Sequence, residues 1–298
     1  MMATPVRSGK VKDVYDQGDS FLFKFTDRIS VFDKIIPTTI PDKGESLCRT
    51  SAFWFDVVSK TTDIPTHFIS LKSKNEMIVK KFNVMPVVPD GYRSNYLVPL
   101  EFVVRYYAEG SLLDRIKSGQ VRKEDLSLAS EPKAGDPLPD PYLEITTKFE
   151  KFDRPLELEE ASRISGLGKL ELKDILEACM TIDRRMLSHV EKSGLIHADG
   201  KKEFAVDEER TPVIVDTFGT ADEDRFWDKS SYDSGKLVEL SKEAVRQYYR
   251  KSGYRDRLYK ARSDGTKEPD IDPLPAEMVS STSAIYRDLF EKMTGQRW

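Results

Sequence analysis

Two short β-type runs near residue 200 constrain the fold of this chain more than any other feature. The runs 199–206 and 213–216 are separated by six polar or turn-prone residues, which predicts a β-hairpin. Symmetric closure of its loop makes Glu203 face Asp216, and directly opposed side chains have Cβ atoms about 4.5–5.5 Å apart. Two interpretations stay open. One is a magnesium site, since Mg²⁺ takes one or two carboxylates plus substrate phosphates. The other is a solvated acidic face on which Lys201 neutralises one charge.

Composition narrows the class of protein. A length of 298 residues favours two domains with a sizeable core, and 33% charged residues indicate a globular protein with a polar surface. The formal net charge of −4 argues against a nucleic-acid-binding protein. Two isolated cysteines, Cys48 and Cys179, make neither a disulfide framework nor a zinc site, which favours a reducing compartment.

The amino-terminal segment 1–8 lacks the apolar core of a signal peptide. No apolar run approaches the roughly 18 residues that a membrane-spanning helix needs. We therefore expect a cytoplasmic protein with no membrane partner and no nucleic-acid partner. The sequence leaves open whether the chain forms a homo-oligomer.

Residues 1–97 are predicted to form a β-rich amino-terminal domain. Amphipathic spacing predicts one helix over 46–60. Apolar β-type runs bounded by turn residues predict strands at 11–15, 21–25 and 77–82. The stretch 85–99, punctuated by proline and glycine, predicts the connection to a second domain.

Residues 98–298 are predicted to form a larger α+β domain with carboxy-terminal helices. We expect a strand at 100–107, a short helix opened by Gly110 and Ser111, and an extended loop at 131–141. Periodic apolar residues then predict helices over 170–192, 234–251 and 275–294. Because antiparallel strands mix with helices and no regular βαβ alternation occurs, the fold class is α+β.

Several common catalytic motifs are missing from the sequence. There is no G-x-x-x-x-G-K-[ST] phosphate loop, no H-E-x-x-H, no C-x-x-C and no G-x-S-x-G, and the pair of glycines at 166–168 lacks the third glycine of a dinucleotide fingerprint. His67, His189 and His197 are scattered along the chain and do not form a ligand set. Each is interpreted as a structural or surface residue.

Two lysine-bearing runs favour phosphate chemistry by another route. Gly9 precedes Lys10, Val11 and Lys12, so the lysines occupy alternate strand positions and share a face, as in the glycine-rich loops of kinase-like folds. The adjacent pair 80–81 adds candidate strand lysines for the α- and β-phosphates. The alternative is that these are ordinary exposed strand lysines.

Further candidates lie in two turns. Arg105 and Ser111 bracket a glycine-containing turn that opens a helix, and a helix amino terminus with a nearby arginine suits a phosphate monoester. The alternative is a surface arginine beside an N-cap serine. Asp222 and Arg225 lie in the acidic loop 220–227, from which they would reach substrate unless the loop is merely solvated.

Taken in order, these segments resemble the SAICAR synthetases, a family of purine biosynthesis. The matching runs span nearly the whole chain: 9–15, 26–33, 40–44, 51–55, 99–105, 110–111, 146–148, 201–204 and 216–227. The resemblance implies a kinase-like or ATP-grasp-like amino-terminal domain. It also implies an ATP- and Mg²⁺-dependent ligase that joins L-aspartate to carboxyaminoimidazole ribotide and gives SAICAR, ADP and phosphate. The resemblance implies that the carboxylate is activated as an acyl phosphate before the amine attacks.

The resemblance also implies roles for individual residues. Magnesium is expected on Glu203 and Asp216, and the ribotide phosphate on Arg105, Ser111 and Arg225. The expected ATP contacts are Gly9, Lys10, Val11, Lys12, Lys80 and Lys81, with Glu101 near the adenosine. The other expected substrate contacts are Asp199, Lys201, Asp222 and Lys148, with Arg28 and the Lys43-Gly44 turn as aspartate or lid candidates. The expected catalytic residues are Lys10, Lys12, Glu203, Asp216 and Arg225.

The chain departs from the family pattern in a few places. Thr217 stands where the family often has glutamate, and Ala221 where proline is usual. The pair Tyr106-Tyr107 replaces a smaller pair after the arginine, and the segment 85–96 is longer than expected. Two other functions compete with the ligase. A kinase-like phosphotransferase would need a catalytic loop of the form H-R-D-x-x-x-x-N, which the sequence lacks. A non-catalytic nucleotide sensor would not need the acidic pair that is present.

Overall fold

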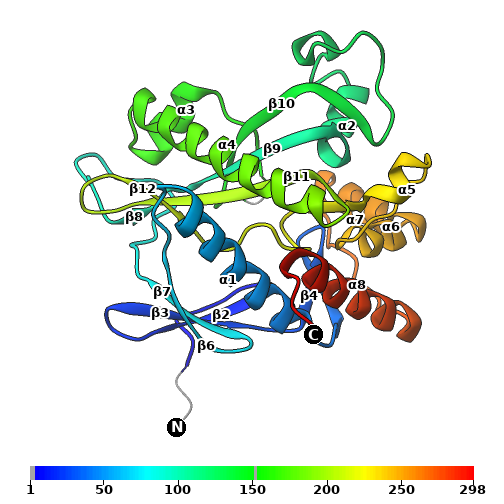
Figure 1. Cartoon of the computed structure of the whole chain (residues 1–298). Coiled ribbons are helices and arrows are strands. Elements are labelled where there is room, and N and C mark those ends of the chain that lie inside the picture. Colours follow the sequence, from blue (N-terminus) through cyan, green and yellow to red (C-terminus); the bar gives the residue numbers. More distant parts are fainter. Residues whose placement is uncertain (1–3, 151–152) are drawn as a thin grey trace.

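The computed structural model describes residues 4–150 and 153–298. Residues 1–3, part of the segment without signal-peptide character, lie outside the described residues. Two antiparallel sheets lie one above the other in the view of Figure 1, and helices pack against and between them. The helices are α1 (Lys43–Thr61), α2 (Gly110–Lys117), α3 (Leu158–Ser165), α4 (Lys169–Lys192), α5 (Lys229–Asp233), α6 (Glu243–Lys251), α7 (Tyr254–Ser263) and α8 (Ala276–Thr294). This mixture confirms the α+β class.

The amino-terminal sheet has the strand order β1-β2-β3-β7-β6 and is antiparallel throughout. Its strands are β1 (Arg7–Ser8), β2 (Lys12–Asp16), β3 (Ser20–Phe25), β6 (Phe68–Ser73) and β7 (Glu76–Lys80). In β3, Phe23 and Phe25 are buried while Lys24 between them is exposed, which is the alternation of a half-buried strand. Helix α1, which corresponds to the predicted helix over 46–60, covers this buried face.

The second sheet is built around its longest strands. Its order is β10-β9-β11-β12, and β13 and β8 also pair with β11. The strands are β8 (Tyr96–Leu97), β9 (Leu100–Ala108), β10 (Asp136–Thr147), β11 (Leu195–Val206), β12 (Pro212–Val215) and β13 (Arg225–Asp228). Helix α4, the predicted helix over 170–192, packs on β11 and β9. The opposite face of β11 is thereby left for the cavity described below.

A small unit joins the carboxy-terminal helices to the first part of the chain. The two-stranded sheet of β4 (Arg28–Val31) and β5 (Lys34–Thr39) buries Ile29 and Ile36 against Tyr249 of α6 and Tyr254 and Leu258 of α7. Residues from the two ends of the sequence therefore share one apolar cluster. The sequence analysis did not predict these two strands or α7.

Two predicted segments differ from the structure. The helix expected over 234–251 is wrong in its first half, because residues 236–241 run beside β13. Leu240 N–H donates to Phe226 O at 2.8 Å, and Trp227 forms a β-bridge with Glu239. The extended loop expected over 131–141 is partly wrong, because β10 already begins at Asp136 and pairs with Ala108.

The main apolar core runs through both halves of the chain. It contains Phe25 and Trp54 from the first 97 residues and Phe102, Ile182 and Phe204 from the remainder. Strand β8, which ends at Leu97, pairs with β11 of the second sheet. The division into domains at 97/98 stays a prediction.

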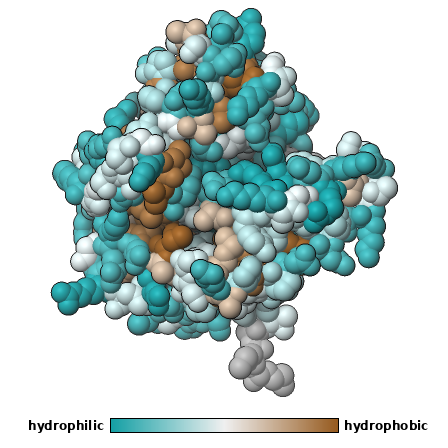
Figure 2. Space-filling model, turned by 90° about the vertical axis from the view of Figure 1, so that its right-hand side faces the viewer, coloured by the Kyte–Doolittle hydropathy of each residue, from teal (hydrophilic) through white to brown (hydrophobic). Residues whose placement is uncertain are grey.

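The surface and the cysteines agree with the composition. Figure 2 shows a largely hydrophilic face interrupted by smaller apolar patches. Cys48 and Cys179 are both buried and free, and burial raises the pKa of each thiol. Within residues 4–150 and 153–298, no helix is both long and apolar enough to cross a membrane.

Candidate active site

A cavity of about 1080 Å³ lies between the two sheets. It is lined by the β1–β2 turn, the end of β7, strands β9 and β11, the segment 215–225 and helix α6. A smaller cavity of about 260 Å³ adjoins it and shares lining residues such as Glu101, Ser111 and Arg225. Segments from both ends of the chain therefore build one continuous site.

Strand β11 presents alternate side chains to this site. Successive strand residues point to opposite faces, so Asp199, Lys201 and Glu203 share the face that lines the cavities. Lys202 points the other way, is fully buried and forms an ion pair with Asp183 of α4. One strand thus supplies three of the predicted site residues.

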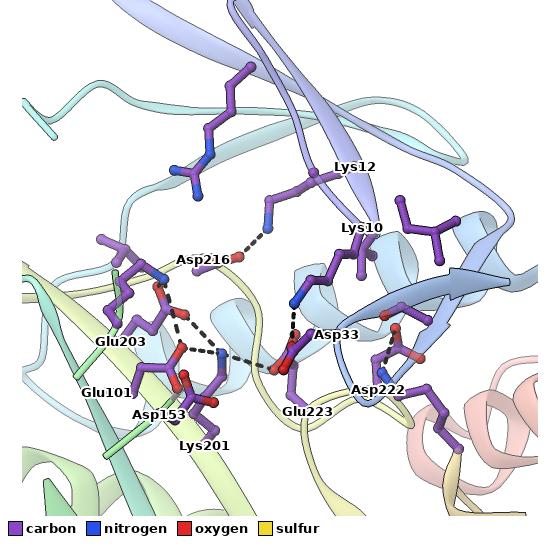
Figure 3. A pocket seen from close by; sticks show the side chains of 18 of the residues that line it. Lys10, Lys12, Asp33, Glu101, Asp153, Lys201, Glu203, Asp216, Asp222 and Glu223 are labelled. Atoms are coloured by element: carbon purple, nitrogen blue, oxygen red, sulfur yellow. Dashed lines mark hydrogen bonds and ion pairs between the residues drawn. The ribbon is translucent and has the colours of Figure 1, made fainter. Parts of the chain in front are cut away.

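Lysines and carboxylates interlock at the centre of the larger cavity. Lys201 Nζ donates to Glu101 at 2.8 Å and to Glu203 at 3.0 Å, and it lies 3.2 Å from a carboxylate oxygen of Glu223. Lys148 forms a second ion pair with Glu203. Figure 3 shows Lys201, Glu101, Glu203 and Glu223 pointing toward one another. We call Glu101, Lys148, Lys201, Glu203 and Glu223 the lysine–carboxylate cluster.

The electrostatics of the cluster follow from burial and from its own charges. Burial raises the pKa of Glu101 to about 7, and repulsion by Glu203 adds to this while Lys201 and Lys148 oppose it. Burial alone would lower the pKa of Lys201, but Glu101, Glu223 and Glu203 raise it well above its ordinary value. Lys201 therefore stays charged, and Glu101 gains or loses its proton near neutral pH.

The acidic hairpin has a different register from the predicted one. Glu203 pairs with Val215, and Val206 pairs with Pro212, so the expectation that Glu203 faces Asp216 is wrong by one residue. The loop is one residue shorter than six, because Pro212 is already in β12. Arg210 in the loop adopts a left-handed conformation with φ 65°.

Asp216 nevertheless reaches the cavity. It follows the last residue of β12 in a left-handed conformation with φ 61°, and its carboxylate forms an ion pair with Lys12 of β2 (Figure 3). Burial would raise the pKa of Asp216, but Lys12, Lys148 and Lys201 together hold it well below its ordinary value. Asp216 is therefore ionised, and it shares two lysine neighbours with Glu203.

The donor set suits a hard cation that uses few protein ligands. Within the described residues, no group of three or more His, Cys, Asp or Glu residues is arranged to hold a metal ion. Glu203 and Asp216 are two carboxylates that line one cavity, each held by a lysine ammonium. Mg²⁺ commonly takes one or two carboxylates and completes its shell with phosphate oxygens and water, so the pair fits this ion.

A second group of predicted residues meets at the amino terminus of α2. Arg105 Nη2 donates to Ser111 Oγ at 3.1 Å, and Arg105 Nη1 donates to Asp199 at 3.1 Å. Arg225 forms an ion pair with the same Asp199 oxygen. Gly110, the first residue of α2, has φ 56°, and a Cβ there would lie 2.9 Å from Cζ of Arg225. Two guanidinium groups and a hydroxyl therefore converge at the amino terminus of α2, where the Gly110 N–H donates to the N-cap residue Glu109 at 3.1 Å.

Burial and pairing fix the charges there. Burial would raise the pKa of Asp199, but Arg225 and Arg105 lower it. Burial would lower the pKa of Arg225, whereas Asp199 and Glu243 raise it. Arg105 is further held by Glu144, whose Oε2 accepts from Arg105 Nε at 2.7 Å. The side chains of both arginines are largely buried and are held by carboxylates.

The predicted phosphate-loop residues are only partly brought together. Gly9, Lys10, Val11, Lys12 and Lys80 all line the larger cavity. The prediction that the two lysines share a strand face is wrong, because Lys10 precedes β2 in the β1–β2 turn. Lys10 forms an ion pair with Asp33, whereas Lys12 points to Asp216 (Figure 3).

Two other predicted residues, Lys81 and Arg28, do not line the cavities. Lys81 does not line either cavity and instead pairs with Asp16 at 2.6 Å on an exposed part of the amino-terminal sheet. Arg28, from the aspartate or lid candidates, donates to Gly9 O at 3.0 Å and to Asp13 at 2.6 Å. Arg28 thus stabilises the β1–β2 turn through its hydrogen bonds to Gly9 and Asp13.

Asp222 links three distant parts of the chain at the wall of the cavity. Lys43 Nζ lies 2.9 Å from its carboxylate and Lys242 Nζ lies 3.5 Å from it, and Tyr286 of α8 donates a hydrogen bond to it. Burial would raise the pKa of Asp222, but Lys242 and Lys43 lower it well below its ordinary value. Burial lowers the pKa of Lys242 to about 8.

Several lining residues were missed by the sequence analysis. Asp153, Glu223, Lys242 and Arg246 all face the cavities. Glu223 lies directly between two predicted residues, so the acidic run itself contained that signal. Lys242 and Arg246 lie at the start of α6, within a segment that was expected to form a single helix over 234–251. Nothing local in the sequence places Asp153.

Three residues that depart from the family pattern, Thr217, Ala221 and Tyr106, make defined contacts in the structure. Thr217 Oγ1 lies 3.5 Å from the Asp216 carboxylate. Ala221 is buried in the main apolar core, where its small side chain packs. Tyr106 OH donates to Asp183 of α4 at 3.1 Å, so the larger side chain is accommodated behind the sheet.

Comparison with known proteins decides the family. The SAICAR synthetase family model matches residues 5–261 of this chain. The chain belongs to the SAICAR synthetase family. Among relatives of this family, the phosphoribosylaminoimidazole-succinocarboxamide synthase of Thermoplasma volcanium is 57% identical, with 98% of each chain covered. The enzyme of the same name from Thermoplasma acidophilum is 55% identical, covering 98% of this chain and 99% of its own.

A solved structure supports the same assignment. The SAICAR synthase of Saccharomyces cerevisiae, complexed with SAICAR, is 25% identical and superposes with a TM-score of 0.74. The match covers 99% of this chain and 96% of that one. The reaction of the SAICAR synthetase family is the ATP-dependent ligation of aspartate to carboxyaminoimidazole ribotide.

Proposed function

We propose that this cavity joins L-aspartate to carboxyaminoimidazole ribotide at the expense of ATP, with the roles of individual residues set out below. The observation that supports the proposal is that two adjoining cavities with shared lining residues contain the lysine–carboxylate cluster and the paired arginines at α2. The first group suits a nucleotide triphosphate with its cation, and the second suits a phosphate monoester. The reaction requires both kinds of ligand at once.

Arg105, Arg225 and Ser111 bind the ribotide phosphate in this proposal. Guanidinium groups bind phosphate oxygens in a bidentate manner, and α2 adds its amino-terminal N–H groups and partial positive charge. Asp199 holds both arginines in place before the phosphate arrives. The ribose and the amino group of the substrate then lie toward Asp199 and Asp222.

Lys10, Lys12 and Lys80 face the phosphates of ATP, together with the backbone of Gly9 and Val11. Glu203 and Asp216 would hold Mg²⁺, which neutralises charge on the transferred phosphoryl group when bound. Lys12 and Lys148 pair with these carboxylates, so both ammonium groups are already aimed at the place where phosphate oxygens would lie. Glu101 lies on the side of the cavity that would hold the nucleotide. Lys201 donates hydrogen bonds to both Glu101 and Glu203 and so offsets their repulsion.

The chemistry consists of two substitutions. The substrate carboxylate oxygen attacks the γ-phosphorus, the bond to the β-phosphate oxygen breaks, and ADP leaves. The aspartate amine then attacks the resulting acyl phosphate, the C–N bond forms, the C–O bond to phosphate breaks, and the nitrogen loses a proton. Phosphoryl transfer needs mainly positioning and neutralised charge, which Lys12, Lys148 and Lys201 supply.

A coupled assay of ADP release tests this function. We expect ADP to form at the full rate only when the ribotide, L-aspartate, ATP and Mg²⁺ are all present. Omission of each component in turn is the control. ADP release at the full rate without aspartate would instead support the kinase-like phosphotransferase.

We also infer a cytoplasmic enzyme whose partners are these small molecules. The formal charge of −4 gives no reason to expect a nucleic-acid partner. Light scattering during gel filtration measures whether the chain forms a homo-oligomer.

A further inference from the structure

Strand β11 carries a buried polar side chain that the reaction does not use, and a register shift between His197 and Asp199 takes His197 out of the alternation that directs Asp199, Lys201 and Glu203 to the cavity. His197 Nε2 lies 2.7 Å from Asp224 Oδ2, and both side chains are fully buried. The His197 ring stacks on Phe226 with centroids 5.0 Å apart. Buried polar pairs are costly unless they are satisfied, so this pair has to be accounted for.

Asp224 belongs to the segment that carries the site. Four consecutive charged residues run from Asp222 to Arg225, and the side chains of Asp222, Glu223 and Arg225 make ion pairs in the cavity walls. Asp224 also borders the smaller cavity, but its side chain is fully buried and pairs with His197. Its backbone N–H donates to Thr220 O at 2.9 Å and closes a turn, which couples the direction of its side chain to the shape of the whole segment.

Gly200 makes room for this arrangement. A Cβ at Gly200 would overlap the Asp224 carboxylate and lie 2.7 Å from His197 Nε2. The adjacent Asp199 holds Arg225. The segment 222–225 is therefore held to β11 by two pairs. Arg225 pairs with Asp199 on the side of the cavity, and Asp224 pairs with His197.

We propose that His197 and Asp224 are positioning residues that fix Arg225 and Glu223 in the active site. The inference rests on the proposed function, because it takes Arg225 as a ligand of the ribotide phosphate. The β11–β13 ladder sets the backbone of Arg225 opposite Asp199, but residues 222–224 precede β13, and the ladder leaves their conformation free. The buried hydrogen bond to His197 removes that freedom.

The test compares variants that keep or remove the buried donor. His197→Leu removes it, whereas His197→Gln keeps an N–H group that can donate to Asp224. Tyr106→Phe is the matched control, because it removes a partly buried hydrogen bond to Asp183 and keeps the ring, whose centroid lies 6.0 Å from that of His197. The measurements are the KM for the ribotide, the KM for ATP, and amide hydrogen exchange across 220–226.

We expect His197→Leu to raise the ribotide KM about tenfold, because a buried hydrogen bond to a charged group is lost, while the KM for ATP changes less than about twofold. Exchange across 220–226 becomes faster in this variant. His197→Gln restores most of the ribotide affinity, and Tyr106→Phe leaves both KM values and the exchange unchanged. If His197→Leu lowers stability but changes both KM values equally, or neither, the pair is merely structural and the inference is overturned.

Arg225→Gln separates this inference from the proposed function. If Arg225→Gln leaves the ribotide KM unchanged, the phosphate assignment fails, and the exchange across 220–226 alone decides whether His197 positions the segment. If Arg225→Gln raises that KM but His197→Leu does not, only the positioning role fails. Should His197→Leu not fold, Asp224→Asn gives the same comparison, because it keeps an acceptor for His197 but loses the charge, and we expect a ribotide KM about threefold higher.

Discussion

Lys12 and Asp216 form an ion pair across the cavity although 204 positions separate them in the sequence. The lysine comes from β2 of the amino-terminal sheet, and the aspartate directly follows β12 of the second sheet. This contact joins the two sheets at the place where we propose that the transferred phosphate lies. The same carboxylate is kept ionised by Lys12, Lys148 and Lys201 against the effect of burial.

Asp216→Asn tests the proposed role of this carboxylate. The substitution keeps the shape of the side chain but removes the charge that would hold Mg²⁺. We expect kcat to fall by about 10³-fold or more, which is typical when a preorganised charge is removed from a reacting centre, while the circular dichroism spectrum stays that of the wild type. Glu208→Gln, an exposed carboxylate in the turn of the same hairpin, is the control. A kcat within about threefold of wild type would contradict the metal role.

Gly110→Ala tests the phosphate site through the backbone. A Cβ at this position would overlap the Arg225 guanidinium, so the arginine has to move away from the amino terminus of α2. We expect the ribotide KM to rise about tenfold or more, since one charge-assisted contact is displaced. Gly119→Ala is a matched control, because Gly119 also has positive φ, 74°, but nothing lies within 4 Å of its Cβ position. Both variants share the backbone strain, and only Gly110→Ala should weaken ribotide binding.

Glu101 predicts a pH dependence of stability. Its pKa is raised from 4.5 to about 7, mainly by burial. Between these values the folded protein holds a proton that the unfolded chain has released, so this group makes the free energy of unfolding decrease as pH rises from about 4.5 to 7. In Glu101→Gln we expect the loss of stability between pH 4.5 and pH 8 to be smaller by about 3 kcal/mol.

Urea denaturation of wild type and Glu101→Gln at both pH values measures this difference. Glu208→Gln again serves as the exposed control, and it should follow the wild-type pH dependence. Parallel curves for wild type and Glu101→Gln would show that Glu101 titrates near its ordinary value.

Substitutions of the residues that contact Asp222 are expected to lower the free energy of unfolding by different amounts. Lys43→Met removes a fully buried ammonium 2.9 Å from Asp222, and we expect it to lower the free energy of unfolding by about 3–5 kcal/mol. Tyr286→Phe removes only a hydrogen bond to the same carboxylate and should cost about 1–2 kcal/mol. Thermal and urea unfolding provide the measurement, with Tyr92→Phe, a partly exposed tyrosine, as control. Equal effects of the two variants at Asp222 would show that the lysine charge is not what stabilises it.

The residues of the site were easier to predict from sequence than their geometry. The structure places Glu203 and Asp216 in one cavity, and both were candidates because they flank an apolar hairpin pattern that is local in sequence. Their facing register was wrong, since it assumed symmetric closure, whereas the left-handed backbone at Arg210 and the early entry of Pro212 into β12 shorten the loop. A one-residue difference in a turn decides the pairing of every following residue.

Contacts between distant segments were not predictable by the same reasoning. The ion pairs of Asp222 with Lys43 and Lys242, and its hydrogen bond from Tyr286, depend on how α1, α6 and α8 pack in three dimensions. Periodicity predicted α8 within one residue of its start but gave no information about which groups it meets. The buried pair of His197 and Asp224 was likewise invisible, because it depends on the space left by Gly200.

The hydrogen bond from Tyr286 of α8 to Asp222 has a consequence for the order in which the protein matures during translation. Chains are synthesised from the amino terminus, and domains tend to fold as they emerge from the ribosome. The residues of both sheets precede α8 in the sequence, so Asp222 lacks its Tyr286 partner until α8 has been synthesised and has packed. We therefore expect the cavity wall at Asp222 to reach its final hydrogen bonding only once α8 is in place.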